Sequence, residues 1–390
     1  MTLFYICVLG VALFGGAFVK FSIAGIQIFY LVLLFLVVAY IKYFYSHWGV
    51  IQLTKINKAI IGFELYALMM IAMSFAGTNK LFASDDLFFE KAYIPRQAYY
   101  VFVIPAILLM EDRDNIDYFK NFLNKNYNII FWIIYIGSMI YSKRFAISVP
   151  TELIIAGLLL WGNDIRRTKS GLLQTLLILF SPIAVGGEMT NMLIRMIYAF
   201  LYFYKNKRNA IKIFGLAFKT MIAGIFILPI MSGLFTNIFD ANSWWRLLYW
   251  KDELAQLVQS YGLGVGYGTS YATENFVGNL GSVVSGPFAA TAEYSTLDKL
   301  FITGPHNSYV SIAFRLGIVG IVLFLVMIFD LIEKISEKNN EISRCAIFML
   351  FSSIVLIGVN VGLESPYYLI MFVFSFGFCA SEVYRAHERY

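Results

Sequence analysis

Residues 307–329 read NSYVSIAFRLGIVGIVLFLVMIF, and Arg315 is the one charged side chain in this stretch. A helix needs about 20 consecutive, predominantly apolar residues to cross the hydrocarbon core of a bilayer, so the stretch predicts a membrane-spanning helix. Backbone polar groups in lipid have to be paired within the chain, which favours helices over open strands. Further apolar runs near this length recur along the whole sequence.

The composition supports the same fold class. Hydrophobic residues make up 59% of the 390 residues and charged residues only 14%, and the mean hydropathy is +0.71. A soluble domain carries roughly a quarter of charged residues, so this chain has too few charges to cover a surface exposed to water. The sequence therefore predicts an all-α polytopic membrane protein.

We expect about twelve transmembrane helices and one long extracytoplasmic loop. Residues 1–236 form an N-terminal bundle of about nine helices, residues 237–306 form the loop, and residues 307–390 hold the C-terminal transmembrane helices. The expected spans are residues 3–19, 22–41, 59–76, 97–110, 128–142, 145–161, 171–187, 189–204, 210–236, 307–329, 343–361 and 366–382.

The distribution of lysine and arginine predicts the orientation. If the N-terminus is cytoplasmic, the cytoplasmic loops and the C-terminal tail carry about twice as many of these cations as the loops on the other side, as the positive-inside rule requires. Both termini are then cytoplasmic, and residues 237–306 lie outside. Because the cations of the +6 net charge fall mostly in these loops, we expect the lipid bilayer as a partner and no nucleic acid.

His306 is the first candidate for chemistry, in the stretch GPHNSY at residues 304–309. Pro305 suits the first turn of a helix, so we expect His306 on a helical stripe with Tyr309 and Gly317. A histidine at the membrane–water boundary titrates near neutrality, which suits a general base. The alternative is a histidine that only anchors a helix at the interface.

The predicted loop holds two further patterns. WWRLLYW at residues 244–250 places Arg246 among tryptophans, where a guanidinium either grips phosphate or anchors the chain at the interface. YGLGVGYG at residues 261–268 has a glycine at every second position. Alternating glycines allow backbone N–H groups to converge on an anion or a sugar, and the alternative is a flexible loop.

Together these motifs resemble those of the O-antigen ligase and polymerase superfamily of bacterial envelope glycosyltransferases. In that family an Arg is followed four residues later by a Trp. A GxGxG turn comes next, and then His-Asn with glycines ten and thirteen residues after the Asn. The matching residues here are Arg246, Trp250, Gly262, Gly264, Gly266, Gly268, His306, Asn307, Gly317 and Gly320.

The resemblance implies a GT-C-like glycosyltransferase of the bacterial inner membrane whose active site faces the periplasm. Its donor would be an undecaprenyl-diphosphate-linked glycan, with no metal and no cofactor, and a chain-length regulator protein is a candidate partner. His306 would deprotonate the acceptor hydroxyl, and Arg246 would stabilise the departing diphosphate. The resemblance and the pattern imply a set of residues that bind the diphosphate or the glycan: Arg195, Arg144, Asn307, Tyr309, Trp250, Gly264 and Gly266.

The sequence departs from the family at one place. Ligases often carry a second Arg in a Thr/Ser-x-Thr/Ser-Arg stretch, whereas residues 186–191 read GGEMTN. Arg195 is the nearest candidate, and its alternative role is a structural pair with Glu188 or Glu364. Arg144, at an outer turn, is a weaker candidate for the diphosphate.

This departure favours a polymerase that joins lipid-linked repeats into O-antigen or capsule-type polysaccharide. The alternative within the family is a ligase that transfers glycan to lipid A-core. A transporter or lipid flippase is a more remote alternative, because Arg195, Lys219 and Arg315 fall within predicted spans. We expect Arg315 on the helix face opposite His306, as a structural or lipid-facing cation.

Overall fold

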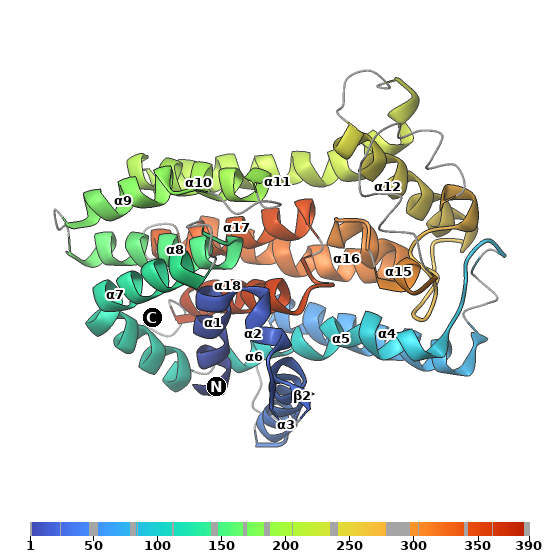
Figure 1. Ribbon diagram of the computed structural model, residues 1–390, viewed down its shortest axis with the longest axis horizontal. Helices are drawn as coiled ribbons and strands as arrows, with labels where there is room; N and C mark the ends of the chain where they lie inside the picture. The colour runs from blue at the N-terminus through green and yellow to red at the C-terminus, as the bar shows by residue number, and fades with distance from the viewer. Residues whose placement is uncertain are drawn as a thin grey trace.

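The computed structural model is all-helical apart from one short hairpin (Figure 1). It describes residues 2–23, 25–46, 54–78, 83, 85–110, 113–141, 147–166, 170–182, 188–204, 206–234, 241–277, 297–302, 304–338, 342–360 and 362–385. Arg144, one of the predicted diphosphate-binding residues, lies outside these ranges.

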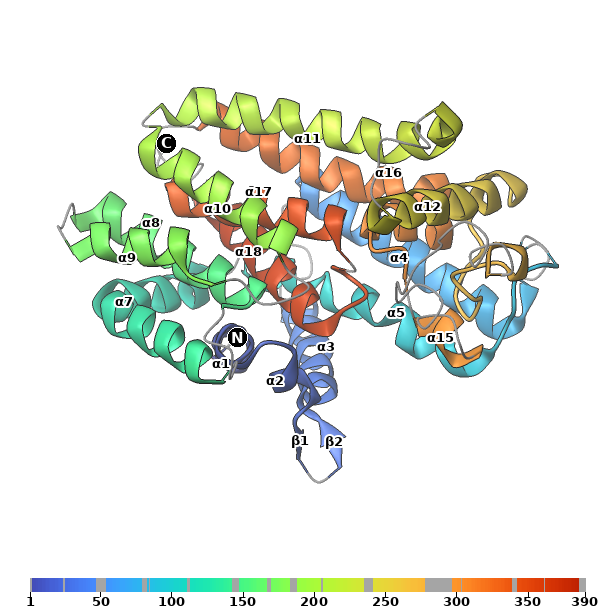
Figure 2. The same cartoon turned by 45° about the horizontal axis from the view of Figure 1, so that its top comes forward.

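The N-terminal half contains short and long helices around a small hairpin. The strands β1 (Ser22–Ile23) and β2 (Ile26–Gln27) pair antiparallel and project from the bundle with α3 (Figure 2). The helices of this half are α1 (Thr2–Phe14), α2 (Gly16–Lys20), α3 (Ile28–Ser46), α4 (Lys55–Ala76), α5 (Ile94–Val103), α6 (Ala106–Met110), α7 (Arg113–Tyr141), α8 (Val149–Arg166), α9 (Ser170–Phe180) and α10 (Glu188–Phe203).

The C-terminal half contains α16, which spans 30 residues and is interrupted at Gly317. Its helices are α11 (Lys207–Ile230), α12 (Ala241–Gln259), α15 (Leu297–Ile302), α16 (Ser308–Glu337), α17 (Arg344–Val359) and α18 (Pro366–Arg385). Residues 237–306, predicted as one long extracytoplasmic loop, contain the helices α12 and α15, and their side of the membrane stays a prediction. The amphipathic sequence of α12 is too polar to read as a span, so hydropathy alone does not detect this helix.

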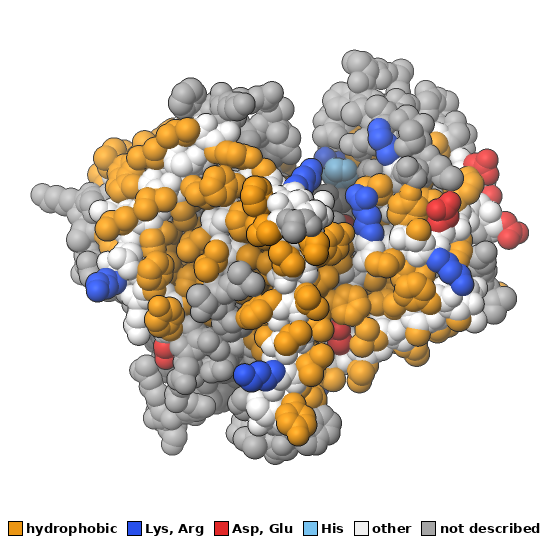
Figure 3. Space-filling view, turned by 60° about the horizontal axis from the view of Figure 1, so that its bottom comes forward, with side chains coloured by type: hydrophobic (Ala, Val, Ile, Leu, Met, Phe, Trp, Pro, Cys, Tyr) orange, Lys and Arg blue, Asp and Glu red, His pale blue; other side chains and the backbone are white. Residues whose placement is uncertain are grey.

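The chain is a multi-pass membrane protein. Among the described residues, six helical segments are long and apolar enough to cross a bilayer, and five shorter apolar helices accompany them. Hydrophobic side chains dominate the face shown in Figure 3, as expected of a surface in contact with lipid. Each of the twelve expected spans overlaps helix, but the number of helices that cross the membrane stays a prediction.

Polar residues at the helix boundaries explain where several helices begin. The side chains of Thr54, Asn206 and Ser343 accept hydrogen bonds from backbone N–H groups in the first turns of α4, α11 and α17. Such N-caps satisfy donors that have no partner within the helix. At the other end of α4, Gly77 adopts φ 79°, the left-handed conformation that ends many helices.

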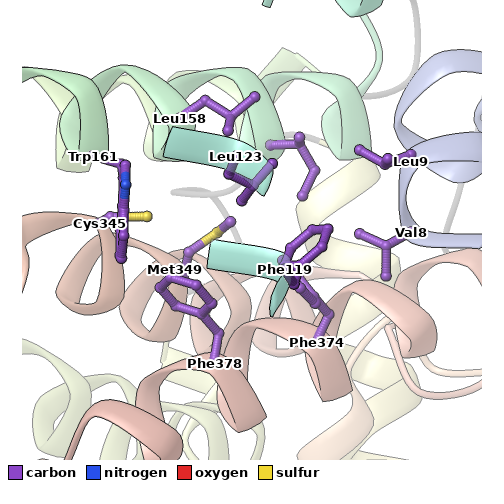
Figure 4. A pocket seen from close by; sticks show the side chains of 11 residues that line it. Val8, Leu9, Phe119, Leu123, Leu158, Trp161, Cys345, Met349, Phe374 and Phe378 are labelled. Carbon is purple, nitrogen blue, oxygen red and sulfur yellow. The ribbon is translucent and has the colours of Figure 1, made fainter. Parts of the chain in front are cut away.

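The core is formed by α16 packed against α4 and by α17 packed against α18. An apolar cavity in the core is lined by α1, α7, α8, α17 and α18, with Met349 and Phe378 among its side chains (Figure 4). Lys120 reaches the same region, where its ammonium lies 4.7 Å from the Phe378 ring centroid and 3.1 Å from Glu382 Oε1. We predicted Lys120 in a cytoplasmic loop, but α7 begins before it at Arg113.

Candidate active site

His306 lies in a tight turn between α15 and α16, outside both helices. Its φ is 56°, in the left-handed region that few residues other than glycine adopt. The predicted stripe of His306 with Tyr309 and Gly317 was wrong, because α16 begins only at Ser308 and Pro305 precedes it. The imidazole direction is therefore set by the turn and not by a helix.

Asn307 holds this turn to the rest of the bundle. Its buried side chain caps α16, with Oδ1 accepting from Tyr309 N (3.0 Å) and Val310 N (3.2 Å). Its Nδ2 donates to the carbonyl of Gly358 at the end of α17 (2.9 Å). The Asn307 amide is thus engaged within the protein, and its role in binding glycan stays a prediction.

Two more side chains fix the turn from either side. Trp250 of α12 donates from Nε1 to the Pro305 carbonyl (2.6 Å). Ser308 Oγ donates to Glu364 Oε2 (2.7 Å) and accepts from Leu363 N (2.9 Å). A left-handed non-glycine residue costs about 1–3 kcal/mol and persists only where the surroundings impose it, which these contacts do.

Residues of α12 face His306 across the turn. The Trp245 ring meets the imidazole edge-on, with centroids 5.5 Å apart and an interplanar angle of 88°. Arg246 is half-buried and close enough for its charge to act on His306. The structure thus brings together three residues predicted from sequence, His306, Arg246 and Trp250. It adds Trp245, which the pattern WWRLLYW contains but which had no predicted role.

The environment lowers the pKa of His306 to about 4. Burial is the larger cause, because it disfavours the charged imidazolium, and the positive charge of Arg246 adds to the effect. The prediction of a histidine that titrates near neutrality was therefore wrong. His306 is therefore neutral at pH 7, the protonation state that a general base requires.

This lowered pKa predicts an unusual pH profile for any activity that needs neutral His306. Protonation removes the base only as pH falls through about 4. We therefore expect turnover limited by this residue to stay constant between pH 7 and pH 5, where an ordinary histidine would already be largely protonated. Rates of the purified protein measured across this range test the prediction, and an acid limb near pH 6.5 would contradict it.

The glycine-rich loop fills a break in α16. Gly317 adopts φ 65° and ψ −165°, so the helix is interrupted there and its neighbouring backbone groups lose their helical partners. The loop supplies new ones: Val265 N donates to the Phe314 carbonyl (2.9 Å), Gly266 N to the Arg315 carbonyl (3.1 Å), and the Gly262 carbonyl accepts from Ile318 N (2.8 Å). This contact explains why glycines stand on both sides.

The other N–H groups of the loop are also used within the protein. Gly264 N donates to Ser260 Oγ (3.1 Å), Tyr267 N to Ser74 Oγ (2.8 Å) and Gly268 N to Gln97 Oε1 (2.7 Å). The expectation that the N–H groups of Gly264 and Gly266 converge on an anion or a sugar is corrected accordingly. These glycines permit a close backbone approach between the loop and α16.

Gly264→Ala should destabilise the protein strongly. A Cβ at this position would lie 2.4 Å from Gly317 N and 2.7 Å from the Arg315 carbonyl oxygen, at φ 84°. Both contacts are with backbone, so we expect the free energy of unfolding to fall by more than about 2 kcal/mol. Gly224→Ala is the matched control, since its Cβ would make only an ordinary contact of 3.8 Å with Leu228. Equal thermal midpoints for the two purified variants would contradict this account of the loop.

Arg315 braces the same loop and does not face lipid. Its side chain is 1% exposed, and Nη1 donates to the Gly266 carbonyl (3.1 Å) and to Thr269 Oγ1. The guanidinium carbon also lies 4.1 Å from the Tyr271 ring centroid. Of the two roles we expected for Arg315, structural and lipid-facing, the structural one is therefore correct.

Tyr309 and Arg195, two of the predicted binding residues, contact other parts of the bundle and not His306. Tyr309 is buried in the bundle and donates to the Ile354 carbonyl (3.0 Å). Arg195 pairs with Glu152, with Nε and Oε1 2.5 Å apart. Its alternative role as one half of a structural pair is thus met by Glu152, whereas we had named Glu188 and Glu364 as the partners; the side chain of Glu188 lies outside the described part of the chain. No contact that the structure gives within its described ranges joins Arg195 to His306. Glu152 was missed although a carboxylate inside a predicted span is itself a signal.

An open apolar groove leads from the side of the bundle to the His306 turn. It has a volume of about 800 Å³ and runs along α11 to Trp250 and Gly358, the residues that hold Pro305 and Asn307. Figure 3 shows basic side chains and a histidine gathered at a hollow in one face of the molecule. Of the three histidines in the chain, only His306 is within the described ranges.

No protein-family model matches the chain, and no curated protein matches it. Within the described ranges, no three histidine, cysteine, aspartate or glutamate side chains are placed to hold a metal ion. Any inference about function therefore rests on the site residues themselves.

Proposed function

We propose that this chain is a membrane glycosyltransferase that polymerises undecaprenyl-diphosphate-linked oligosaccharide repeats into O-antigen or capsule-type polysaccharide. The observation that carries the proposal is the grouping of neutral His306 with Arg246 and Trp245, beside Trp250, which lines an apolar groove and bonds to Pro305. This arrangement offers a base, a cation and a path for a lipid in one place. The protein would lie in a bacterial inner membrane, and a chain-length regulator is a candidate partner.

The proposed reaction needs only these groups. His306 takes the proton of an acceptor hydroxyl, and the acceptor oxygen forms a bond to the anomeric carbon of the donor sugar. The bond from that carbon to the lipid diphosphate breaks, and its electron pair leaves on the diphosphate. Arg246 offsets the negative charge that develops on this leaving group. A rigid turn suits this task, because the base has to stay aligned with the acceptor.

The groove along α11 supports a lipid-linked donor. Its walls are almost wholly apolar, with Leu216, Ile225 and Leu228 among them, and it is open at the side of the bundle. A polyprenyl chain lying there places its diphosphate near Trp250, next to the turn of His306. Soluble sugar nucleotides would gain nothing from such a surface.

A transporter or lipid flippase is the second candidate, because a discontinuous helix such as α16 is typical of transporters. In those proteins the break coordinates the substrate, whereas here the loop 262–268 occupies it. The experiment that separates the two is turnover by purified protein. Lipid-linked repeat units incubated with the protein in detergent should yield a ladder of longer glycans. Recovery of the unchanged donor alone would sink the glycosyltransferase proposal.

The proposal requires that the site face away from the cytoplasm, which labelling can test. The native cysteines Cys7, Cys345 and Cys379 are all buried and give a low background. Val258 at the end of α12 is 76% exposed, and Asn209 at the start of α11 is also exposed. In intact cells we expect an impermeant maleimide to label Val258→Cys but not Asn209→Cys. The reverse pattern would place His306 on the cytoplasmic side and exclude an extracytoplasmic transferase.

A further inference from the structure

A second groove lies between α11 and α16, towards the end of α11 that begins at Lys207. It has a volume of about 580 Å³. Gly215 lines it from α11, and Phe329 and Ile332 line it from α16. Behind it the two helices are in contact, since the Phe218 and Phe329 ring centroids are 5.2 Å apart. The groove is open and its walls are largely apolar, so it is accessible from the lipid phase.

Two lysines of α11 line this groove. Lys212 and Lys219 are seven residues apart, which places them on the same face of the helix, and both are exposed. The structure gives neither side chain a hydrogen bond or an ion pair with another described residue. Gly215 lies between them in the sequence and adds no side chain to this part of the groove.

Lys219 occupies an unusual depth. At 1.5 Å per residue it lies about 18 Å along the axis from Lys207, near the middle of a helix that is about 36 Å long. A cation at this depth is costly in hydrocarbon and usually has a partner. Long side chains on a helix tend to point towards its N-terminus, which for Lys219 is the side of Lys212.

Other cations of the helical bundle have partners in the protein. Arg195 pairs with Glu152, Lys120 with Glu382, and Lys334 with Asp330. The groove does contain one acidic residue, Glu333 of α16, which is exposed and forms no ion pair with either lysine in the described structure. The net charge along the groove is therefore positive, and its partner has to come from outside the chain.

We propose that this groove binds an anionic glycerophospholipid of the bilayer. Its phosphate lies between Lys212 and Lys219, and its acyl chains lie over Gly215 against the apolar side chains of α16. Basic pockets between transmembrane helices favour anionic headgroups, and the apolar walls select a lipid over a free phosphate ion. The site adjoins the groove at Trp250, with which it shares Leu216 and no other lining residue, and the inference does not rest on the proposed enzymatic function.

Lipid binding to the purified full-length protein tests the site directly. The delipidated protein in a neutral detergent is titrated with phosphatidylglycerol or with phosphatidylcholine of the same acyl chains, and bound lipid is counted by native mass spectrometry. We expect wild-type protein to prefer phosphatidylglycerol. Because a lysine near a lipid surface contributes about a fivefold change in affinity, Lys219→Gln should weaken phosphatidylglycerol binding by about that factor.

Three further variants sharpen the test. Lys212→Gln combined with Lys219→Gln should remove the preference for phosphatidylglycerol altogether. Glu333→Gln should have the opposite sign and strengthen binding, because it removes the one negative charge of the groove. Lys58→Gln is the matched control, since Lys58 is an exposed lysine in the first turn of α4 outside the groove, and it should bind as wild type does.

Several outcomes would overturn the inference. Equal affinity of the wild type for the two lipids would mean that Lys219 reaches the headgroup region without binding an anionic lipid specifically. Unchanged phosphatidylglycerol binding by the double variant would place the lipid elsewhere. Displacement of the lipid by millimolar inorganic phosphate would identify a site for the free ion. A lack of glycan transfer by the protein would leave these measurements unaffected.

Discussion

His306→Ala should abolish the glycan polymer while leaving the protein folded in the membrane. A positioned general base contributes typically 10²–10⁴-fold to a rate, so we expect turnover to fall by about a hundredfold or more. Lipid-linked single repeats should accumulate in place of the ladder. Gel analysis of the glycans, together with the amount of membrane-inserted protein, measures both effects.

A second substitution separates the base from the turn. Residue 306 has φ 56°, which glycine adopts without strain, so His306→Gly should keep the turn while it removes the imidazole. We expect His306→Gly to be inactive and to regain activity when imidazole is added to the assay. Asn307→Ala should instead be inactive without rescue, because it loses the cap of α16 and the tie to Gly358. If His306→Ala made long polymer, His306 would not be the base and would only anchor a helix.

The hydropathy of the sequence was sufficient to predict the helical fold. Runs such as residues 307–329 have no other stable state in lipid, and α16 lies where that run predicts it. That Arg246, Trp250 and His306 belong to one site could also be predicted, although only from the order in which their motifs occur along the sequence. Hydropathy could not detect α12, which carries Arg246 and Trp250. Charged and polar residues are interspersed among its apolar residues, so the average hydropathy of the helix is low.

The contact between the glycine loop and α16 could not be predicted from local pattern. Residues 262–268 and Gly317 are about fifty positions apart, and each segment alone has a plausible independent role. The loop resembles an anion-binding turn, and Gly317 resembles an ordinary small residue at a helix interface. Only the pairing of Val265 N with the Phe314 carbonyl reveals that each completes the backbone hydrogen bonding of the other.

The properties of His306 depend on the same kind of long-range contact. Its left-handed turn follows from Trp250 and Glu364, which lie 56 and 58 positions away and reach the residues on either side of it. Its lowered pKa follows from burial against Trp245 and from the charge of Arg246. Its position at the predicted membrane–water boundary led us to expect an accessible histidine, whereas the tertiary contacts bury it.

Arg246→Ala should strongly reduce the rate of glycan transfer, because it removes one electrostatic contact to the transition state. Removing such a contact costs on the order of 3 kcal/mol in the barrier, which is about a hundredfold in rate. Arg246→Lys should remain strongly impaired, because lysine offers a point charge in place of the planar fork that binds phosphate oxygens. Turnover of a lipid-linked donor by the purified variants measures the effect. Chelators should leave the wild-type rate unchanged, since in the proposed reaction an arginine stabilises the charge of the leaving diphosphate.

The same substitution has a second readout that an interfacial anchor would not produce. Arg246 helps to lower the pKa of His306, so its replacement by alanine should raise that pKa and move the acid limb of the residual activity above pH 4. The Lys variant keeps the charge and should hold the limb where the wild type has it. Lys251→Ala, an exposed lysine on the same helix, is the control and should change neither rate nor limb. Normal turnover by Arg246→Ala would leave Arg246 as an anchor for α12, and the diphosphate would then need another cation, with Arg144 and Arg195 the next to test.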